Sequence, residues 1–372
     1  MPSHFQSPQR IARLTPLDDL LARVDALVQP VAPRNIKLAA ALGRTLARDV
    51  IITETLPNAA LALRDGWALR SDLTIDASSY APAPIPGAQW INAGEILPAD
   101  ADAVAPLDVV LTDEGEAQAI APVAPSEGVL PAGSDFRTGI ILASGRRIRP
   151  VAIAALTCAG ISEAAVREPS VQITRARERA DPVIDGAIGC IADAVRRLGG
   201  IAVIADGQPL EHALNNQAAD AVIVVGGTGT GRNDGAITAL ASHGKLVAHG
   251  IGLNPGDSSG FAMMGRRPAL ALPGRFDAAL AAWHMLGRHI VGRLAGNIET
   301  LLLRSARLTH KVTSVVGMAE LVPVRCAGAC ATPIASGYVP LGAMAEANGW
   351  LFIKAESEGH PAGHEVMIRP WP

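Results

Sequence analysis

A glycine-rich turn at residues 226–231 is the part of the chain best suited to binding an anion. It follows the apolar run 221–225 and consists of Gly226, Gly227, Thr228, Gly229, Thr230 and Gly231. Such turns leave backbone N–H groups free to approach a ligand. A helix predicted to start near residue 236 would point its positive end at the same place, favouring an anion by about 0.3–1 kcal/mol. Taken alone, the glycines are equally typical of an ordinary strand–helix turn.

The elements around this turn predict an α/β domain. Short apolar runs alternate with helical patterns between residues 166 and 296, and the predicted strands are 171–174, 201–205, 221–225, 246–251 and 269–272. This alternation is typical of a parallel sheet with helices on both faces. In such sheets ligands bind beyond the carboxyl ends of the strands, which is where the glycine turn falls.

The flanking regions predict further domains. Thr15 and Pro16 have the pattern of a helix N-cap followed by proline at the first helical position. Short β-prone runs separated by Pro, Gly and Asp follow from residue 54, among them 119–123, and strand-like composition returns after residue 300. We expect a linker domain (9–53 and 145–167), an inserted β-rich domain (54–144), the α/β domain (168–299) and a β-rich C-terminal domain (300–372).

Composition and charge limit the possible partners. The formal charge of −3 and the lack of a basic run with interleaved aromatic residues argue against a nucleic-acid partner. An apolar signal-peptide core and a long apolar stretch are both missing, so we expect a cytoplasmic protein without a membrane partner. Cys326 and Cys330 would hold a metal only with two further ligands nearby.

Several motifs in order resemble the molybdopterin molybdenumtransferase family, called MoeA in bacteria and the gephyrin E-domain in animals. The similarity covers about residues 15–366. The motifs are Leu56-Pro57, Asp65-Gly66-Trp67-Ala68, Asn92-Ala93-Gly94, Gly226-Gly227 with Gly231 and Asp234, His249-Gly250, Pro255-Gly256, and Leu272-Pro273-Gly274. Each motif alone is weak, whereas the complete ordered series is specific.

The resemblance implies both a fold and an activity. Members combine a helical linker domain, an inserted β-rich lobe, a three-layer α/β domain with a mostly parallel sheet, and a C-terminal β-barrel, and they form homodimers. They hydrolyse adenylylated molybdopterin and insert molybdate into its dithiolene, with acids holding a divalent cation. The implied ligand-binding residues are the glycine turn together with Pro255, Gly256, Pro273, Gly274 and Arg275.

Catalytic roles are implied for three remaining acids, Asp234, Asp185 and Asp65, with Asp234 as a ligand of Mg²⁺, a cation that prefers oxygen ligands. The alternative is a structural role, in which Asp65 stabilises a turn and Asp185 caps a helix. Asp234 has the stronger functional case because it lies between the glycine turn and the predicted helix. We interpret His249 as a structural residue at a strand end rather than a ligand.

The chain departs from the family at several polar positions. Ala60 and Ala176 stand where the family has polar or acidic residues, and Asn254 and Asp257 replace two lysines. Losing two charge-assisted contacts of about 1.5–3 kcal/mol each would weaken the usual ligand by about two to four powers of ten. Arg175, Arg232 or Arg275 would have to compensate.

Three functional interpretations remain open from the sequence. The first is a divergent molybdenum-inserting enzyme, and the second is a protein of the same fold that only binds or delivers molybdopterin or a related phosphorylated ligand. The alanines at positions 60 and 176 favour the second. The third, a dinucleotide-dependent oxidoreductase, requires an acid about twenty residues beyond the glycine turn. That distance holds His249 and Asn254, with no acid before Asp257.

Overall fold

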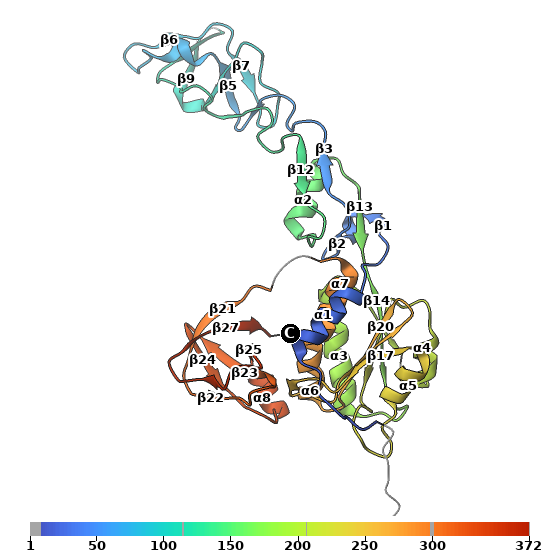
Figure 1. Ribbon diagram of the computed structural model, residues 1–372. Helices are drawn as coiled ribbons and strands as arrows, with labels where there is room; N and C mark the ends of the chain where they lie inside the picture. The colour runs from blue at the N-terminus through green and yellow to red at the C-terminus, as the bar shows by residue number, and fades with distance from the viewer. Residues whose placement is uncertain (1–8, 114, 206, 298–300, 372) are drawn as a thin grey trace, which may run out of the picture. The chain divides into compact units, whose positions relative to one another are not determined.

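The protein divides into two compact units. The computed structural model describes residues 9–113, 115–205, 207–297 and 301–371 (Figure 1). One unit contains the described residues up to 48, residues 144–157 and the chain from 161 onward; the other contains residues 49–143 and 158–160. This division does not separate a linker domain from the α/β domain, and the four predicted domain boundaries stay predictions.

The α/β domain is built on a six-stranded sheet in the order β15-β14-β16-β20-β19-β17. Five strands are parallel to one another, and β19 is antiparallel to both of its neighbours. The strands are β14 (Ser170–Arg175), β15 (Ile201–Ala205), β16 (Ala221–Val225), β17 (Lys245–His249), β19 (Gly260–Met264) and β20 (Arg267–Leu272). β19 was not predicted, because the run Phe-Ala-Met-Met lacks the β-branched residues typical of strands.

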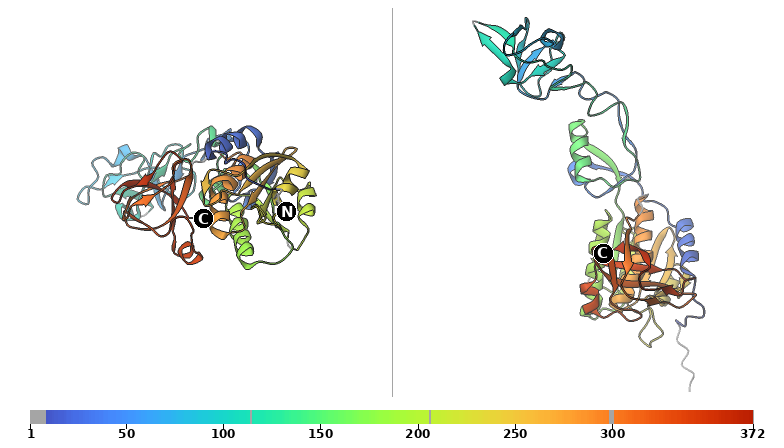
Figure 2. Two further views of the ribbon diagram at one scale, coloured as in Figure 1. Left: turned by 60° about the horizontal axis from the view of Figure 1, so that its bottom comes forward. Right: turned by 90° about the vertical axis from the view of Figure 1, so that its left-hand side faces the viewer.

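Helices cover both faces of this sheet and make three layers (Figures 1 and 2). One face packs against α3, α6 and α7, with α1 next to α7, and the other packs against α4 and α5. The helices are α1 (Leu17–Leu27), α3 (Pro182–Arg197), α4 (Leu210–Asn215), α5 (Ala236–His243), α6 (Phe276–Ala282) and α7 (Arg288–Ala295), with a π-helical turn at Trp283–Gly287.

The position of β14 decides where a ligand can bind. β14 pairs with β15 on one side and with β16 on the other, both in parallel. The carboxyl ends of β14 and β16 therefore lie at the same edge of the sheet. From there the chain continues to opposite faces, to α3 after β14 and to α5 after β16. This is a topological switch point, at which open α/β sheets place their ligand crevice. The glycine turn follows β16 directly.

The N-terminal segment corrects one prediction. α1 begins at Leu17, Pro16 occupies the N-cap position, and no side chain caps the helix. Thr15 forms a parallel bridge with Ile251, and its N–H donates to the carbonyl of Gly250 at 2.9 Å. The prediction that Thr15 caps α1 is therefore wrong, because its backbone is extended alongside the α/β domain.

The remaining parts of the first unit are a small linker sheet and a barrel. The linker elements are β1 (Arg34–Lys37), the 3₁₀ turn Leu38–Ala40, β2 (Thr45–Leu46), α2 (Pro150–Cys158) and β13 (Glu163–Arg167). The barrel strands are β21 (Arg304–Leu308), β23 (Ala319–Ala327), β24 (Cys330–Pro333), β25 (Gly349–Ile353) and β27 (Glu365–Pro370), and pairing of β23 with β25 closes it. Smaller elements are β18 (Leu253–Asn254), which pairs with β23, β22 (Val312–Thr313), β26 (Gly359–His360) and α8 (Leu341–Glu346). The predicted α/β multidomain fold class with a C-terminal barrel is confirmed.

The second unit consists of short strands and 3₁₀ turns around small cores. The strands are β3 (Val50–Ile52), β4 (Leu61–Ala62), β5 (Gly66–Leu69), β6 (Ala83–Pro84), β7 (Gln89–Ile91), β8 (Ala103–Ala105), β9 (Val110–Asp113), β10 (Glu116–Ala119), β11 (Val129–Leu130) and β12 (Gly139–Leu142); the turns are Ser71–Thr74 and Leu107–Val109. A strand at 119–123 was predicted, whereas β10 ends at residue 119. In neither unit do the described residues form a helix with the length and apolar character needed to span a membrane.

A buried aromatic cluster joins the π-helical turn to the barrel. The His284 ring lies 6.0 Å from that of Trp350, which stacks on Trp371 at 4.4 Å. His284 is 3% exposed, and neither of its ring nitrogens has a hydrogen-bond partner. Burial, reinforced by the positive charges of Arg288 and Arg369, lowers the pKa of His284 to about 3. His284 is therefore neutral in the folded protein at any ordinary pH.

Acid is expected to destabilise this cluster through His284. In the unfolded chain His284 has the ordinary histidine pKa of 6.5 and binds a proton that it does not bind in the folded chain. The free energy of unfolding is therefore highest above about pH 6.5 and falls as the pH drops toward 3. Between pH 6.5 and 5.0 this loss amounts to about 1.5–2 kcal/mol. Urea unfolding followed by tryptophan emission should show a shallower pH dependence in His284→Phe than in the wild type. An exposed control, His310→Phe, should keep the wild-type slope; equal slopes in all three proteins would contradict the assignment.

Candidate functional site

A pocket of about 670 Å³ lies at the switch point, where the loops after β14, β16 and β20 meet. Its wall on the β16 side is the glycine turn, and the loop after β14 forms the facing wall. The lining residues are Ala176, Arg177, Arg179, Ala180, Asp181, Pro182, Ile184, Val225, Gly226, Gly227, Thr228, Gly229, Asp234, Ser258, Pro273, Gly274 and Arg275. We call this the glycine-loop pocket.

The backbone of the glycine turn requires glycine at one position on two grounds. Gly227 has φ of +66°, and a Cβ added there would lie 2.8 Å from the Cβ of Ala176 in the facing loop. A left-handed backbone and so close an approach both exclude a side chain. Ala176, which replaces a polar residue of the family pattern, thus packs directly against the turn.

The N-terminus of α5 is closed by the protein itself. The Gln9 side chain is 2% exposed, and its Oε1 accepts from the N–H groups of Ile237 at 2.9 Å and Thr238 at 3.1 Å. The N-cap residue Gly235 has no side chain to supply this contact. These two N–H groups of α5 are therefore bonded to Gln9, and the predicted effect of the positive end of the helix on an anion at the turn stays a prediction.

The carbonyl groups of the glycine turn also accept hydrogen bonds from other side chains of the protein. Gln9 Nε2 donates to the carbonyls of Gly227 at 3.1 Å and Gly229 at 2.9 Å. His249 Nε2 lies 3.1 Å from the carbonyl of Thr228. Neither Gln9 nor His249 lines the pocket. The interpretation of His249 as a structural residue agrees with this contact.

Asp234 lines the pocket but is folded back onto its own loop. Its Oδ2 accepts the N–H of Gly231 at 3.0 Å, and its Oδ1 lies 3.1 Å from Nη2 of Arg177. Among the described residues, no group of three or more His, Cys, Asp or Glu side chains is arranged to hold a metal ion. A metal held by protein side chains alone therefore does not fit this part of the chain.

The other two acids predicted to be catalytic lie outside the glycine-loop pocket. Asp185 is in the first turn of α3 and pairs with Arg175 Nε at 3.2 Å, while Asp181 caps that helix through the N–H of Val183 at 2.9 Å. The alternative that Asp185 caps a helix is therefore wrong, because the cap of α3 is Asp181, four residues earlier. Asp65 belongs to the second unit, where its carboxylate accepts the N–H of Ala93 at 2.8 Å.

Arginines give the pocket positive charge. Arg177 and Arg179 come from the loop after β14, and Arg275 follows β20. Arg275 binds the 2%-exposed Asp277 through Nε at 3.1 Å and Nη2 at 2.5 Å, and this pairing raises the pKa of Arg275. Of the three arginines expected to compensate for the missing lysines, only Arg275 lines the pocket.

Four predicted ligand-binding residues do not line the pocket: Thr230, Gly231, Pro255 and Gly256. A Cβ on Gly256 would lie 3.4 Å from the carbonyl of Ala278 in α6, so this loop packs against a helix. The same loop does contribute Ser258, whose hydroxyl lies 3.1 Å from that of Thr228.

Four polar residues that line the pocket were not predicted from the sequence: Arg177, Arg179, Asp181 and Ser258. A usable signal existed for the first three, because they lie in the loop after a predicted parallel strand, and such loops carry ligand-binding groups. Ser258 gave no comparable signal, since its approach to Thr228 depends on how the loop before β19 folds.

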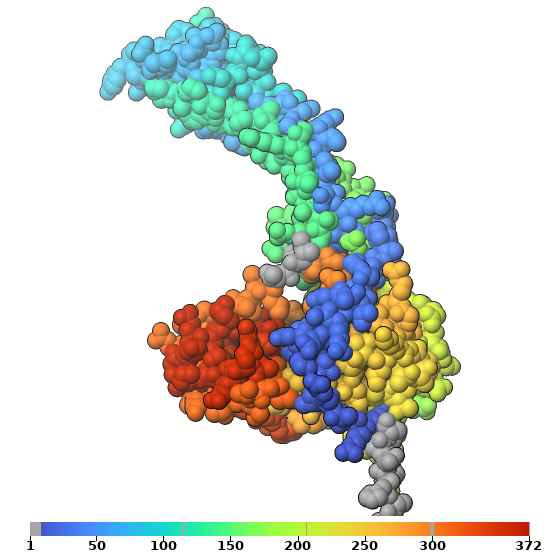
Figure 3. All heavy atoms as spheres, in the orientation of Figure 1, coloured from blue at the N-terminus to red at the C-terminus, as the bar shows by residue number. Residues whose placement is uncertain are grey.

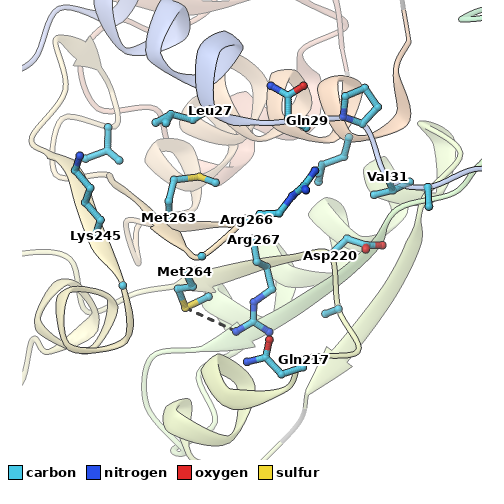
Figure 4. A pocket seen from close by; sticks show the side chains of 17 residues that line it. Leu27, Gln29, Val31, Gln217, Asp220, Lys245, Met263, Met264, Arg266 and Arg267 are labelled. Atoms are coloured by element: carbon cyan, nitrogen blue, oxygen red, sulfur yellow. Dashed lines mark hydrogen bonds between the residues drawn. The ribbon is translucent and has the colours of Figure 1, made fainter.

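A second pocket, of about 700 Å³, lies at the amino-terminal edge of the sheet (Figure 4). Lys245 and Arg266 are exposed on its rim, and the 7%-exposed Arg267 reaches the carbonyls of Leu214 and Asn216 and lies 3.8 Å from the Met264 sulfur. Its buried cation therefore holds the loop before β16 in place. The glycine-loop pocket is the better candidate because it combines a backbone turn and arginines at the ligand-binding edge.

Comparison with known families agrees with this arrangement. Residues 15–160 match the MoeA N-terminal region (domain I and II), residues 187–293 match a probable molybdopterin binding domain, and residues 305–371 match the MoeA C-terminal region (domain IV). The three matches follow one another in order along the chain.

Individual relatives align over nearly the whole chain. A putative molybdopterin biosynthesis protein of Methanocaldococcus jannaschii is 23% identical, over 90% of this chain and 91% of the relative. The molybdopterin molybdenumtransferase of Staphylococcus aureus is 23% identical over 95% and 94%. The crystal structure of the molybdopterin biosynthesis MoeA protein from Pyrococcus horikosii is similar with a TM-score of 0.75 at 26% identity, covering 97% of this chain and all of that one.

Replacing Gly227 with alanine should close the glycine-loop pocket. The new Cβ would both strain the backbone and press on Ala176, so we expect isothermal titration with inorganic pyrophosphate to show at least about tenfold weaker binding. Gly265→Ala is a matched control, because Gly265 has φ of +64° and no heavy atom within 4 Å of the added Cβ. Equal pyrophosphate affinity in the two variants would argue against a ligand at the turn.

Proposed function

The chain belongs to the MoeA family and is a MoeA-like molybdenum cofactor biosynthesis protein, and we propose that its glycine-loop pocket binds adenylylated molybdopterin for molybdenum insertion. One observation carries the proposal: the glycine turn and three arginines meet at the switch point, in the part of the chain that matches a probable molybdopterin binding domain. Backbone N–H groups and guanidinium groups are both suited to phosphate.

The proposed binding residues form one surface. Gly226, Gly227, Thr228 and Gly229 present backbone to the phosphates, with Arg179 and Arg275 supplying charge. Arg179 makes no hydrogen bond or ion pair with any described residue, so its guanidinium is available to a ligand. Pro273 and Gly274 close the wall on the β20 side. In this arrangement arginines from other loops take over the role of the lysines missing at positions 254 and 257.

The proposed reaction releases AMP. Water cleaves the phosphoanhydride of the adenylylated ligand and releases AMP and molybdopterin. The two dithiolene thiols of molybdopterin then bind the molybdenum of molybdate, and one oxo group leaves as water with the two thiol protons. Asp234 is the acid nearest the glycine turn, and we propose that it is the catalytic carboxylate. Since Mg²⁺ is usually bound through one or two carboxylates together with substrate phosphates, Asp234 is also the proposed protein ligand of a Mg²⁺ shared with the phosphates.

The other predicted roles stay proposals. Asp185 would position Arg175 beside the pocket through their ion pair. Asp65, in the second unit, would act only through its turn with Ala93. We propose a homodimer on the basis of the family resemblance, and a cytoplasmic location without nucleic-acid or membrane partners on the basis of the sequence.

A protein that only binds or delivers molybdopterin is the second candidate. The alanines at positions 60 and 176 motivated it, because the chain lacks polar groups at those places. It is not favoured, since relatives named molybdopterin molybdenumtransferase align with 95% of this chain without a missing domain.

Replacement of Asp234 by asparagine tests the enzymatic part of the proposal. The variant keeps the size of the side chain but loses its charge, so magnesium-dependent AMP release from adenylylated molybdopterin should fall by about 10²–10⁴. Binding of the ligand, measured by titration, should be retained. Asp193→Asn is the control, since Asp193 is on α3, pairs with Arg197 and lies outside the pocket. An unchanged rate in Asp234→Asn would clear Asp234 of a catalytic role, and failure of the wild type to bind molybdopterin in either form would end the whole proposal.

A further inference from the structure

The contacts behind the glycine turn determine which way its peptide groups face. All peptide bonds of the turn are trans, and in a trans peptide the C=O and N–H of one unit point in opposite directions. Three successive carbonyls, those of Gly227, Thr228 and Gly229, are directed at Gln9, His249 and Gln9 respectively. The N–H groups of the same peptide units belong to residues 228, 229 and 230, and each must point away from these side chains.

Two of these three N–H groups belong to residues that line the pocket, Thr228 and Gly229. Gln9 and His249 do not line it. Within the described ranges, none of the N–H groups of residues 228–230 donates to another protein group. We propose that Gln9 and His249 are positioning residues, which bind the carbonyls on the far side of the turn and so present the N–H groups of Thr228 and Gly229 to a phosphate in the pocket. The inference rests on the proposed function.

The geometry of Gln9 allows only one orientation of its amide. The carbonyl of Gly229 accepts from Gln9, the carbonyl of Gly227 accepts from Gln9 in addition to the N–H of Ala236 at 3.0 Å, and the N–H groups of Ile237 and Thr238 need an acceptor. A glutamine amide supplies two N–H donors and an acceptor oxygen, whereas a glutamate carboxylate has no donor. Glutamate at position 9 would still cap α5 but would face two carbonyl oxygens. The substitution Gln9→Glu therefore removes the donors to the turn while it keeps the cap of α5.

Neighbouring contacts fix the segment that carries Gln9. The first described segment, residues 9–16, lies along the α/β domain (Figure 3). Thr15 exchanges hydrogen bonds with the backbone of Gly250 and Gly252, at 2.9 and 2.8 Å. A Cβ on Gly250 would lie 2.5 Å from the Ile11 side chain. Gly250 directly follows His249. The segment that carries Gln9 is therefore held, through Ile11 and Thr15, against the backbone next to His249.

The test compares variants that keep or remove the donor. Gln9→Glu and His249→Leu remove a donor to the turn, and His249→Gln keeps one. Isothermal titration with inorganic pyrophosphate should show at least about tenfold weaker binding for Gln9→Glu and at least about fivefold for His249→Leu, as expected for losing a bond that orients a charged contact. His249→Gln should stay within about threefold of the wild type. Gln29→Glu, which adds the same charge at an exposed position, is the control.

Hydrogen exchange distinguishes a local change in the glycine turn from a loss of stability of the whole domain. Amides 228–230 should exchange faster in Gln9→Glu and His249→Leu, with the rest of the sheet unchanged. Wild-type affinity, within about twofold, in both donor-removing variants would overturn the inference while leaving the pocket in place. Equal weakening in His249→Leu and His249→Gln would also overturn it, because donation would then be irrelevant. If Gln9→Glu fails to fold, the His249 pair decides; if the wild type binds neither pyrophosphate nor molybdopterin, both this inference and the proposed function fail.

Discussion

The parallel pairing of β14 with β15 on one side and β16 on the other is the constraint on which the site depends. It brings the loop after β14, which carries Arg177 and Arg179, opposite the glycine turn after β16. Neither loop would form a pocket alone. Because Gly227 approaches Ala176 to within contact distance, the two loops also limit each other's shape.

The charges of the pocket follow from this arrangement. Acids at the site are engaged within the protein: Asp181 caps α3, Asp234 closes the turn through Gly231, and Asp277 holds Arg275. The guanidinium group of Arg179 and the backbone N–H groups of Thr228 and Gly229 are therefore what the pocket offers to a ligand. This composition suits a phosphorylated ligand better than a metal ion held by protein side chains.

The fold could be predicted largely from sequence, and the site only in part. The run Ala221–Val225 and the helix Ala236–His243 have local patterns that dictate their structure, and both occur at the predicted residues. Gln9 reaches the turn across 218 residues of chain, and no local pattern encodes such a contact. β19 was missed because its residues have no strand preference of their own and pair only with their neighbours in the sheet. Asp185 was misplaced because the cap of α3 is four residues earlier, at Asp181.

Hydrogen exchange of the protein with and without molybdopterin locates the ligand. Binding in the glycine-loop pocket should slow exchange at residues 175–182, 226–230 and 273–275, which line or adjoin that pocket. Slowing confined to residues 29–32 and 263–267, around the pocket at the amino-terminal edge of the sheet, or no slowing at saturating ligand, would contradict binding in the glycine-loop pocket.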